Sequence, residues 1–246
     1  LSDPGAAGST LARTGVRTSG GGTIEVVAGT GTITIDGEGS RYGTALGVGS
    51  SAYAKDGTAT LIQSASSSAA AITLSGTGGH GLTLRGASSK IHATGVSGGI
   101  TLNGTSSSWS SAVYSPLELL AVSGPIRWLN SDATNGIYTE NATITIGSKA
   151  GIAGLTASTS DVTVNLKKLA GSPTFAIGTA GAVTIQGVDG SAAFGQEFST
   201  SQFGLNANGQ TMSAFTFGSV GNTANITINT NVQALGPIVA HAGNLT

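Results

Sequence analysis

Asp36 and Glu38 are the two acidic residues closest together in the sequence, and a pair of carboxylates is what the cleavage of a polysaccharide requires. The two carboxyl groups of a glycosidase lie about 5 to 9.5 Å apart, one as the acid and the other as the base or nucleophile. We expect Gly37 to form a corner between them, because glycine adopts sharp turns at no steric cost. The other acidic residues are scattered, and the sequence predicts no enzyme.

Metal and cofactor chemistry has equally weak support. The histidines, His80, His92 and His241, lie far apart and lack the spacing of a metal site. His92 falls in the middle position of a strand, which predicts a solvent-facing side chain. Residues 76–81 fit the glycine pattern of a dinucleotide-binding loop, and residues 95–99 fit a serine nucleophile elbow. Both patterns need a helix to follow, and strands follow instead, so we predict corners and no cofactor or metal.

Contact with a glycan would use aromatic side chains, because their rings combine a large apolar face with a polar end. The candidates lie in the stretch 105–140: Trp109, Tyr114, Trp128 and Tyr138. The alternative is that these rings cover the core where the regular pattern is interrupted.

Asn-x-Thr triplets are the acceptor pattern for N-glycosylation. They begin at Asn103, Asn141, Asn225 and Asn244. Such triplets arise freely in a chain so rich in threonine. The first three are candidate glycosylation sites.

The composition excludes several classes of protein. Only 9% of the residues are charged, against about 25% in typical soluble domains. A net charge of -1 does not suit a nucleic-acid partner, which requires clustered Lys and Arg. No apolar run is long enough to span a membrane, so we expect no membrane insertion. Without cysteine, stability must come from packing and backbone hydrogen bonds.

One phrase recurs in the sequence: apolar, polar, apolar, polar, glycine. It occupies Ile72–Gly76, Leu82–Gly86, Ile91–Gly95 and Ile100–Gly104. The alternation is typical of a half-buried strand, but so short a strand leaves its backbone groups unpaired on its own. Stacking on the corresponding strand of the next turn supplies the partners, with glycine at each corner. This predicts an all-β chain, a right-handed parallel β-helix (β-solenoid) with about twenty residues per coil and about twelve coils.

A sandwich or barrel of antiparallel hairpins is the competing all-β interpretation. Its strands would be longer, and its Asp-Gly or Asn-Gly turns would follow one another more closely than they do here. We predict one domain over residues 1–246. Residues 1–22 form an N-terminal extension or cap, and irregular insertions lie near 105–140 and 188–217.

Threonine fills the middle position of nine strand phrases. These are Thr34, Thr73, Thr83, Thr101, Thr145, Thr163, Thr184, Thr216 and Thr227. On one flat face, such an array would bind ice or another crystalline lattice. Threonine is also simply a good outward-facing strand residue. Four phrases break the pattern, at Glu25, His92, Arg127 and Ala176, and we expect the phrases to lie on more than one face.

The strings TITIDGEGS, GGITLNGTSSS, ATITIGSKAGI and NTANITINTNVQALGPIVAHAGNLT resemble the repeat regions of filamentous-haemagglutinin-like bacterial exoproteins. The resemblance covers most of residues 22–246 and rests on composition and cadence. It implies a right-handed parallel β-helix, extracellular exposure, a scaffolding or adhesive task and no active site. The secretion domain of that family carries Asn-Pro signatures, and none occurs here, which favours the shaft over the export signal.

We therefore expect a structural or adhesive segment of a secreted bacterial cell-surface protein, forming a stiff rod or filament. Its expected partners are glycans or proteins of a host or neighbouring cell, and flanking repeats or other copies joined end to end. A β-helix that binds or cleaves polysaccharide, or one that binds ice or another lattice, is the alternative.

Overall fold

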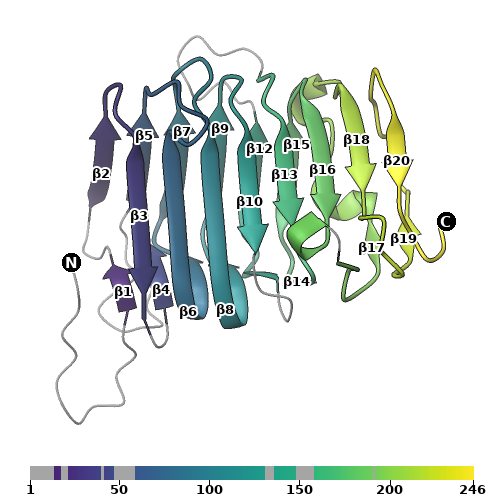
Figure 1. Cartoon of the computed structure of the whole chain (residues 1–246), viewed down its shortest axis with the longest axis horizontal. Helices are drawn as coiled ribbons and strands as arrows, with labels where there is room; N and C mark the ends of the chain where they lie inside the picture. Colours follow the sequence, from purple (N-terminus) through teal and green to yellow (C-terminus); the bar gives the residue numbers. More distant parts are fainter. Residues whose placement is uncertain are drawn as a thin grey trace.

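The computed structural model describes residues 14–17, 22–39, 42–46, 59–130, 136–147, 158–190 and 192–246. Strands dominate these residues, and every strand pair among them is parallel (Figure 1). The prediction of an all-β chain with parallel pairing is confirmed, and antiparallel hairpins are absent from the described part.

The strands stack in three rows. Row one contains β3 (Ile33–Glu38), β6 (Ile72–Leu84), β8 (Ile100–Val113), β10 (Ile126–Asn130), β13 (Val162–Asn165), β16 (Ala182–Gln186), β18 (Ala214–Phe217) and β20 (Ile238–Ala240). Row two contains β1 (Thr14–Arg17), β4 (Tyr42–Leu46), the C-terminal halves of β6 and β8, β11 (Ile137–Thr139) and β14 (Leu169–Ala170). Row three contains β2 (Thr23–Ala28), β5 (Ala59–Ser64), β7 (Ser88–Ala93), β9 (Leu117–Ala121), β12 (Thr143–Gly147) and β15 (Thr174–Gly178).

The remaining elements lie toward the C-terminal end of the stack. β17 (Phe198–Ser199) and β19 (Ile226–Thr227) pair with each other. In the described part of this region, three short 3-10 helices connect strands: η1 (Val188–Gly190), η2 (Thr200–Phe203) and η3 (Ala207–Gly209). No described helix has the length and apolar character needed to cross a membrane.

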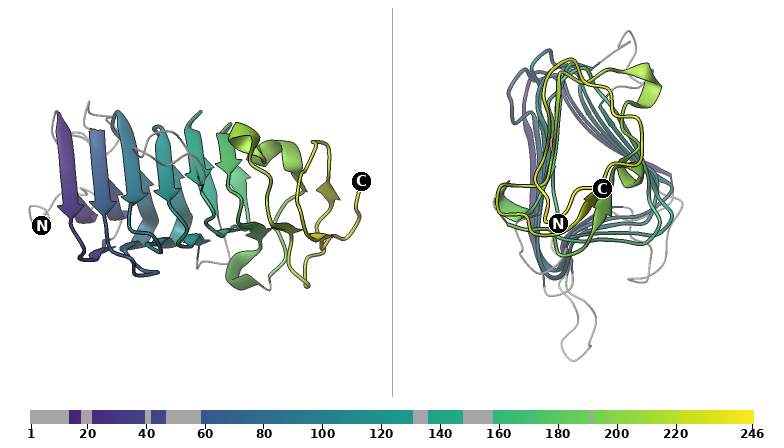
Figure 2. Two further views of the ribbon diagram at one scale, coloured as in Figure 1. Left: turned by 90° about the horizontal axis from the view of Figure 1, so that it is seen from above. Right: turned by 90° about the vertical axis from the view of Figure 1, so that its right-hand side faces the viewer.

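From β2 to β16 the chain visits the rows in a constant order: row three, row one, row two. The right-hand view of Figure 2 looks along the stack and shows successive layers following a common outline. The recurring phrase follows this path. The phrases that start at Ile72, Leu82 and Ile91 lie in rows one, two and three, and the phrase at Ile100 returns to row one, where Ile100 pairs with Ile72. Three phrases complete this layer.

The expected spacing of about twenty residues per coil is therefore wrong for most layers. Between row-one partners the spacing is smallest, 21 residues, from Asn165 to Gln186. It is largest, 39 residues, from Asp36 to Ser75. Among the described residues, row one has eight strands, against about twelve expected coils, because the connections between rows are longer than the phrase alone suggested.

The core lies between the rows and consists of in-register apolar columns. In row one, Ile72, Ile100 and Ile126 stack directly on one another and are almost completely buried. Complete burial of each such side chain contributes about 1.5–3 kcal/mol. Residues that pair in neighbouring strands thus also stack on one another in the core. A slip of one residue would move the apolar side chains of a strand to its other face, and this fixes the register of every layer.

Phenylalanines fill the core toward the C-terminal end. Phe203 is fully buried, and its ring centroid lies 5.6 Å from those of both Phe175 and Phe217 and 5.9 Å from that of Phe198. The stretch 188–217, expected to be irregular, contains η1, η2 and η3 together with β17 and β18. Its aromatic rings replace the aliphatic columns of the earlier layers.

Corner glycines are required for two different reasons. Gly86 has a φ of 87°, a left-handed conformation that side chains disfavour. Gly104 lacks positive φ, but a Cβ placed on it would overlap the carbonyl oxygen of Ser110. At Gly104 the cause is the close approach of two backbone segments where β8 passes from row one to row two.

The segment 105–140 was expected as an insertion, yet its described residues carry paired strands in all three rows, including β9, β10 and β11. Most of the expected N-terminal extension, residues 1–22, lies outside the described residues. Within that range, β1 pairs with β4 in row two.

Candidate functional site

Three of the four candidate aromatic residues lie together on row two. The ring centroid of Tyr138 is 5.7 Å from that of Trp109 and 5.5 Å from that of Tyr114. All three side chains are half-buried, so part of each ring faces outward. We call Trp109, Tyr114 and Tyr138 the aromatic cluster.

The strand register explains how residues so far apart in sequence meet. Tyr138 in β11 pairs with Ala112 in β8. Because Ala112 is small and buried, it leaves room for the Tyr138 ring next to it. Trp109 lies three residues before Ala112 and Tyr114 two residues after it. Tyr138 therefore contacts both neighbours from the adjacent layer.

Arg85 lies beside this cluster. It follows the last residue of β6, and its guanidinium carbon is 3.9 Å from the centroid of the Tyr114 ring. The residue is only 4% exposed, and its Nε has no hydrogen-bond partner among the described residues. Arg85 had no signal in the sequence, because only the pairing of Leu84 with Val113 places it opposite Tyr114.

The expectation that Trp128 contacts a glycan is wrong. Its side chain is fully buried, and its Nε1 donates a hydrogen bond of 2.9 Å to Ser111 Oγ. Trp128 shares the inward face of β10 with Ile126, two residues earlier. An indole at this position fills the core and cannot reach a surface ligand.

The acidic pair also differs from the expectation. β3 continues through Gly37, so no corner separates Asp36 from Glu38. Both side chains are exposed on the same face of the strand, where two residues span about 6.7 Å. Asp36 Oδ1 accepts a hydrogen bond of 2.6 Å from Ser75 Oγ in the next layer. The pair lies on an open strand surface and engages a neighbouring serine.

His92 is buried, contrary to the expected exposed position. Its Nε2 lies 3.5 Å from Glu118 Oε2, longer than a good hydrogen bond, so the contact is mainly electrostatic. Burial lowers the pKa of His92 and is the dominant effect. The Glu118 carboxylate opposes it by favouring the protonated imidazole, while nearby Lys90 adds to the lowering. The pKa of His92 thus lies below its ordinary value.

The other histidines are in different parts of the fold. His80 in β6 has its ring centroid 5.5 Å from that of Tyr42, and His241 follows β20. Within the described ranges, no group of three or more histidine, aspartate or glutamate side chains is placed to hold a metal ion.

The threonine positions divide among the rows. In row one the threonines form one outward column: Thr34, Thr73, Thr101, Thr163, Thr184 and Thr216. Arg127 interrupts this column between Thr101 and Thr163. Thr83 is buried in row two, whereas Thr145 lies in row three beside Glu118 and Ala176. Thr227 belongs to β19.

The three candidate glycosylation sites have different surroundings. Asn103 lies within β8 and pairs with Ser75 on one side. Asn141 is exposed between β11 and β12, with a φ of 50° that asparagine tolerates. Asn225 is half-buried, and its Nδ2 donates a hydrogen bond of 2.6 Å to Glu197 Oε1.

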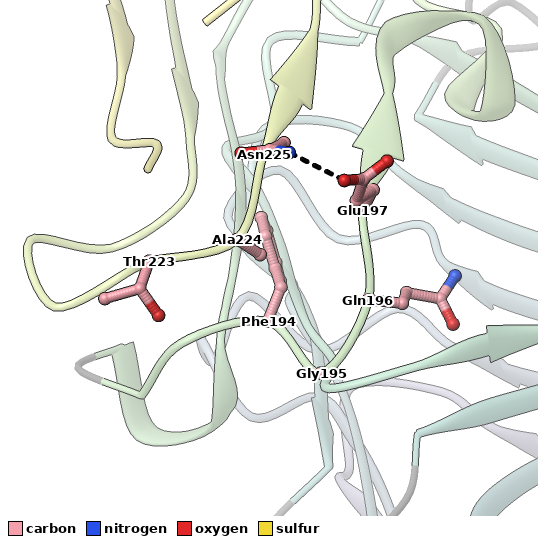
Figure 3. A pocket seen from close by; sticks show the side chains of 7 residues that line it. All are labelled: Phe194, Gly195, Gln196, Glu197, Thr223, Ala224 and Asn225. Carbon is pink, nitrogen blue, oxygen red and sulfur yellow. Dashed lines mark hydrogen bonds between the residues drawn. The ribbon is translucent and has the colours of Figure 1, made fainter. Parts of the chain in front are cut away.

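Asn225 lines an open pocket of about 320 Å³ together with Phe194, Gly195, Gln196, Glu197, Thr223 and Ala224 (Figure 3). The Asn225 oxygen accepts a hydrogen bond of 3.2 Å from Asn244 Nδ2. Asn244, Asn225 and Glu197 thus form a ladder across successive layers. The side-chain polar groups of Asn225 and Glu197, which line the pocket, are therefore already hydrogen-bonded.

No protein-family model matches the chain, and no match is found among curated proteins or among solved structures.

Proposed function

We propose that the chain is a segment of a right-handed parallel β-helix that serves as a stiff structural and adhesive shaft of a secreted bacterial surface protein. The observation that carries the proposal is the constant order in which the chain visits three in-register rows. At about 4.8 Å per layer, the eight described strands of row one extend about 34 Å along the stack. Such a stack grows in one direction only, which suits a shaft.

The side chains of row one also support a scaffolding role. Their apolar columns are continuous, so each layer is stabilised mainly by its two neighbours. Low charge, 9% of residues, limits repulsion between layers. The half-buried aromatic cluster provides the candidate adhesive surface on the side of the stack.

Two measurements on the purified chain test this proposal. Cryo-electron microscopy should resolve a right-handed coil with layers about 4.8 Å apart. Beads coated with the chain should adhere to epithelial cells, and Trp109→Ala with Tyr138→Ala should reduce the adhesion. A left-handed coil would overturn the fold assignment, and adhesion no greater than that of albumin-coated beads would overturn the adhesive role.

A second candidate, binding to ice, is favoured by the in-register threonine column of row one. Each threonine presents a hydroxyl and a methyl group at the spacing of one layer. Thermal hysteresis of the chain in water tests it. Arg127→Thr should increase the hysteresis by completing the column, and Thr101→Lys should reduce it. Thr145→Lys, in row three, is the matched control and should leave it unchanged.

A further inference from the structure

Arg85 is a buried cation with unsatisfied hydrogen-bonding capacity. It is 4% exposed, its Nε has no hydrogen-bond partner among the described residues, and the described carboxylates form no ion pair with it. Removing a guanidinium from water is costly unless its donors are paired. The Tyr114 ring, whose centroid lies 3.9 Å from the guanidinium carbon, stabilises one face of the cation. The Nε donor remains to be satisfied.

A partner that matches the donors of a guanidinium is a carboxylate. The planar fork of arginine binds the two oxygens of a carboxylate in parallel, a geometry that lysine does not offer. The nearest acidic position in the same column is Glu140, which follows Thr139 as Tyr114 follows Val113. Tyr114 therefore lies between Glu140 and Arg85, and about two layer spacings, or about 10 Å, separate their backbones.

The aromatic cluster indicates what carries the carboxylate. Trp109, Tyr138 and Tyr114 form a continuous, half-buried set of rings that ends at Arg85. Rings of this kind pack against the apolar face of a sugar and leave their polar ends for its hydroxyl groups. A sugar ring on the cluster would hold its acid group beside the guanidinium.

We propose that Arg85 and the aromatic cluster form a binding site for a carboxylated saccharide, with the sugar ring against Trp109 and Tyr138 and its carboxylate on Arg85. This inference rests on the proposed adhesive function and names the ligand class of its surface. The shared chemistry is a sugar acid, which a uronic-acid polymer or a sialylated glycan would supply.

Binding to polygalacturonate and to its fully methyl-esterified form separates charge recognition from sugar recognition. The experiment uses the 1–246 chain in EDTA, to exclude calcium gels, and at about 150 mM salt, to screen surface charges. A charged hydrogen bond of about 1.5–3 kcal/mol predicts that the acid binds at least about tenfold more tightly than the ester. Sialyllactose compared with lactose provides the second source of the same acid group.

Variants assign the effect to the site. Arg85→Gln should abolish the preference for the acid, whereas Trp109→Ala should weaken acid and ester binding by the same factor. Arg127→Gln removes an exposed arginine from row one and should change neither. Urea midpoints show whether each variant is folded, and if Arg85→Gln unfolds, Arg85→Lys replaces it because it retains the charge without the fork.

The outcomes are distinct. Preference for either acid, lost in the Arg85 variant, supports the site and identifies the source. Equal binding of acid and ester together with equal binding of sialyllactose and lactose overturns it, as does an equal loss in Arg127→Gln. If beads carrying the chain still adhere to cells while neither acid binds, only this inference fails and the adhesive function stands.

Discussion

Trp128 Nε1 donates a hydrogen bond of 2.9 Å to Ser111 Oγ, and both side chains are buried in the core. Ser111 Oγ in turn donates to Asn130 Oδ1 at 3.0 Å, and Asn130 Nδ2 donates to the carbonyl oxygen of Asn165. A polar chain thus crosses the interior from row two to row one. Because every member has a partner, the core tolerates these polar groups.

Ser111→Ala should destabilise the fold by about 1–3 kcal/mol, because it leaves the indole N–H of Trp128 buried without an acceptor. Urea unfolding followed by tryptophan fluorescence measures the change. Ser107→Ala removes an exposed hydroxyl from the same strand and is the matched control. Equal midpoints for the two variants would show that the indole finds another partner.

Gly104→Ala should destabilise the fold by about 1–3 kcal/mol or more, because the new methyl group overlaps the backbone of Ser110. Gly29→Ala is the control, since a Cβ there has no neighbour within 4 Å and the residue lacks positive φ. It should be neutral or slightly stabilising, as it restricts the unfolded chain. Denaturant midpoints measure the change in stability of each variant. A Gly104→Ala variant as stable as the parent chain would contradict the close approach of the two backbone segments.

His92 makes the free energy of unfolding decrease as the pH falls. Because burial lowers its pKa in the folded state, the unfolded chain binds a proton first as the pH falls. The contribution of His92 is fully present above about pH 6.5, the unfolded pKa, and decreases below it. Urea midpoints between about pH 5 and 8 should show this slope, and His92→Gln should flatten it.

Glu118 provides a second test of the same pair. Glu118→Gln removes the charge that favours protonated His92, so the pKa of His92 should fall further. The decline in stability at acidic pH should then extend to lower pH. His241→Gln removes a histidine from another part of the fold and should leave the His92 slope in place. A slope that survives His92→Gln would assign it to other groups.

Phe203→Ala should destabilise the fold by about 3–5 kcal/mol, because it empties the centre of the phenylalanine cluster. Val220→Ala, at a residue 87% exposed, should change the free energy of unfolding by no more than about 0.5 kcal/mol. Thermal unfolding followed by circular dichroism compares them. Similar values for the two variants would mean that the cluster collapses around the lost ring.

Much of the strand pattern was predictable because its period is local. The phrase at Ile72 correctly predicted half-buried strands, and their parallel stacking followed from their shortness. The number of faces was not predictable, since a corner and a connection of any length look alike in a glycine-rich sequence. That uncertainty produced the wrong coil length.

The candidate site was likewise predictable only in part. Trp128 could have been assigned to the core, because Ile126 two residues earlier shares its strand face. The meeting of Trp109, Tyr114 and Tyr138 depends on the register of β8 and β11, which no local pattern encodes. Arg85 was invisible for the same reason, because its partner Tyr114 belongs to the next layer and is distant in the sequence.

The ladder hydrogen bonds of all three rows run along the direction in which the layers stack. Tension applied along that direction loads one interlayer seam at a time, so the terminal layer detaches before its neighbours. Each detachment in row one releases the residues that separate two paired strands, from 21 in the shortest case to 39 in the longest. When extended, this stretch of chain is about 70 to 130 Å long. Under force, the molecule therefore lengthens in unequal steps whose sizes follow from the strand register.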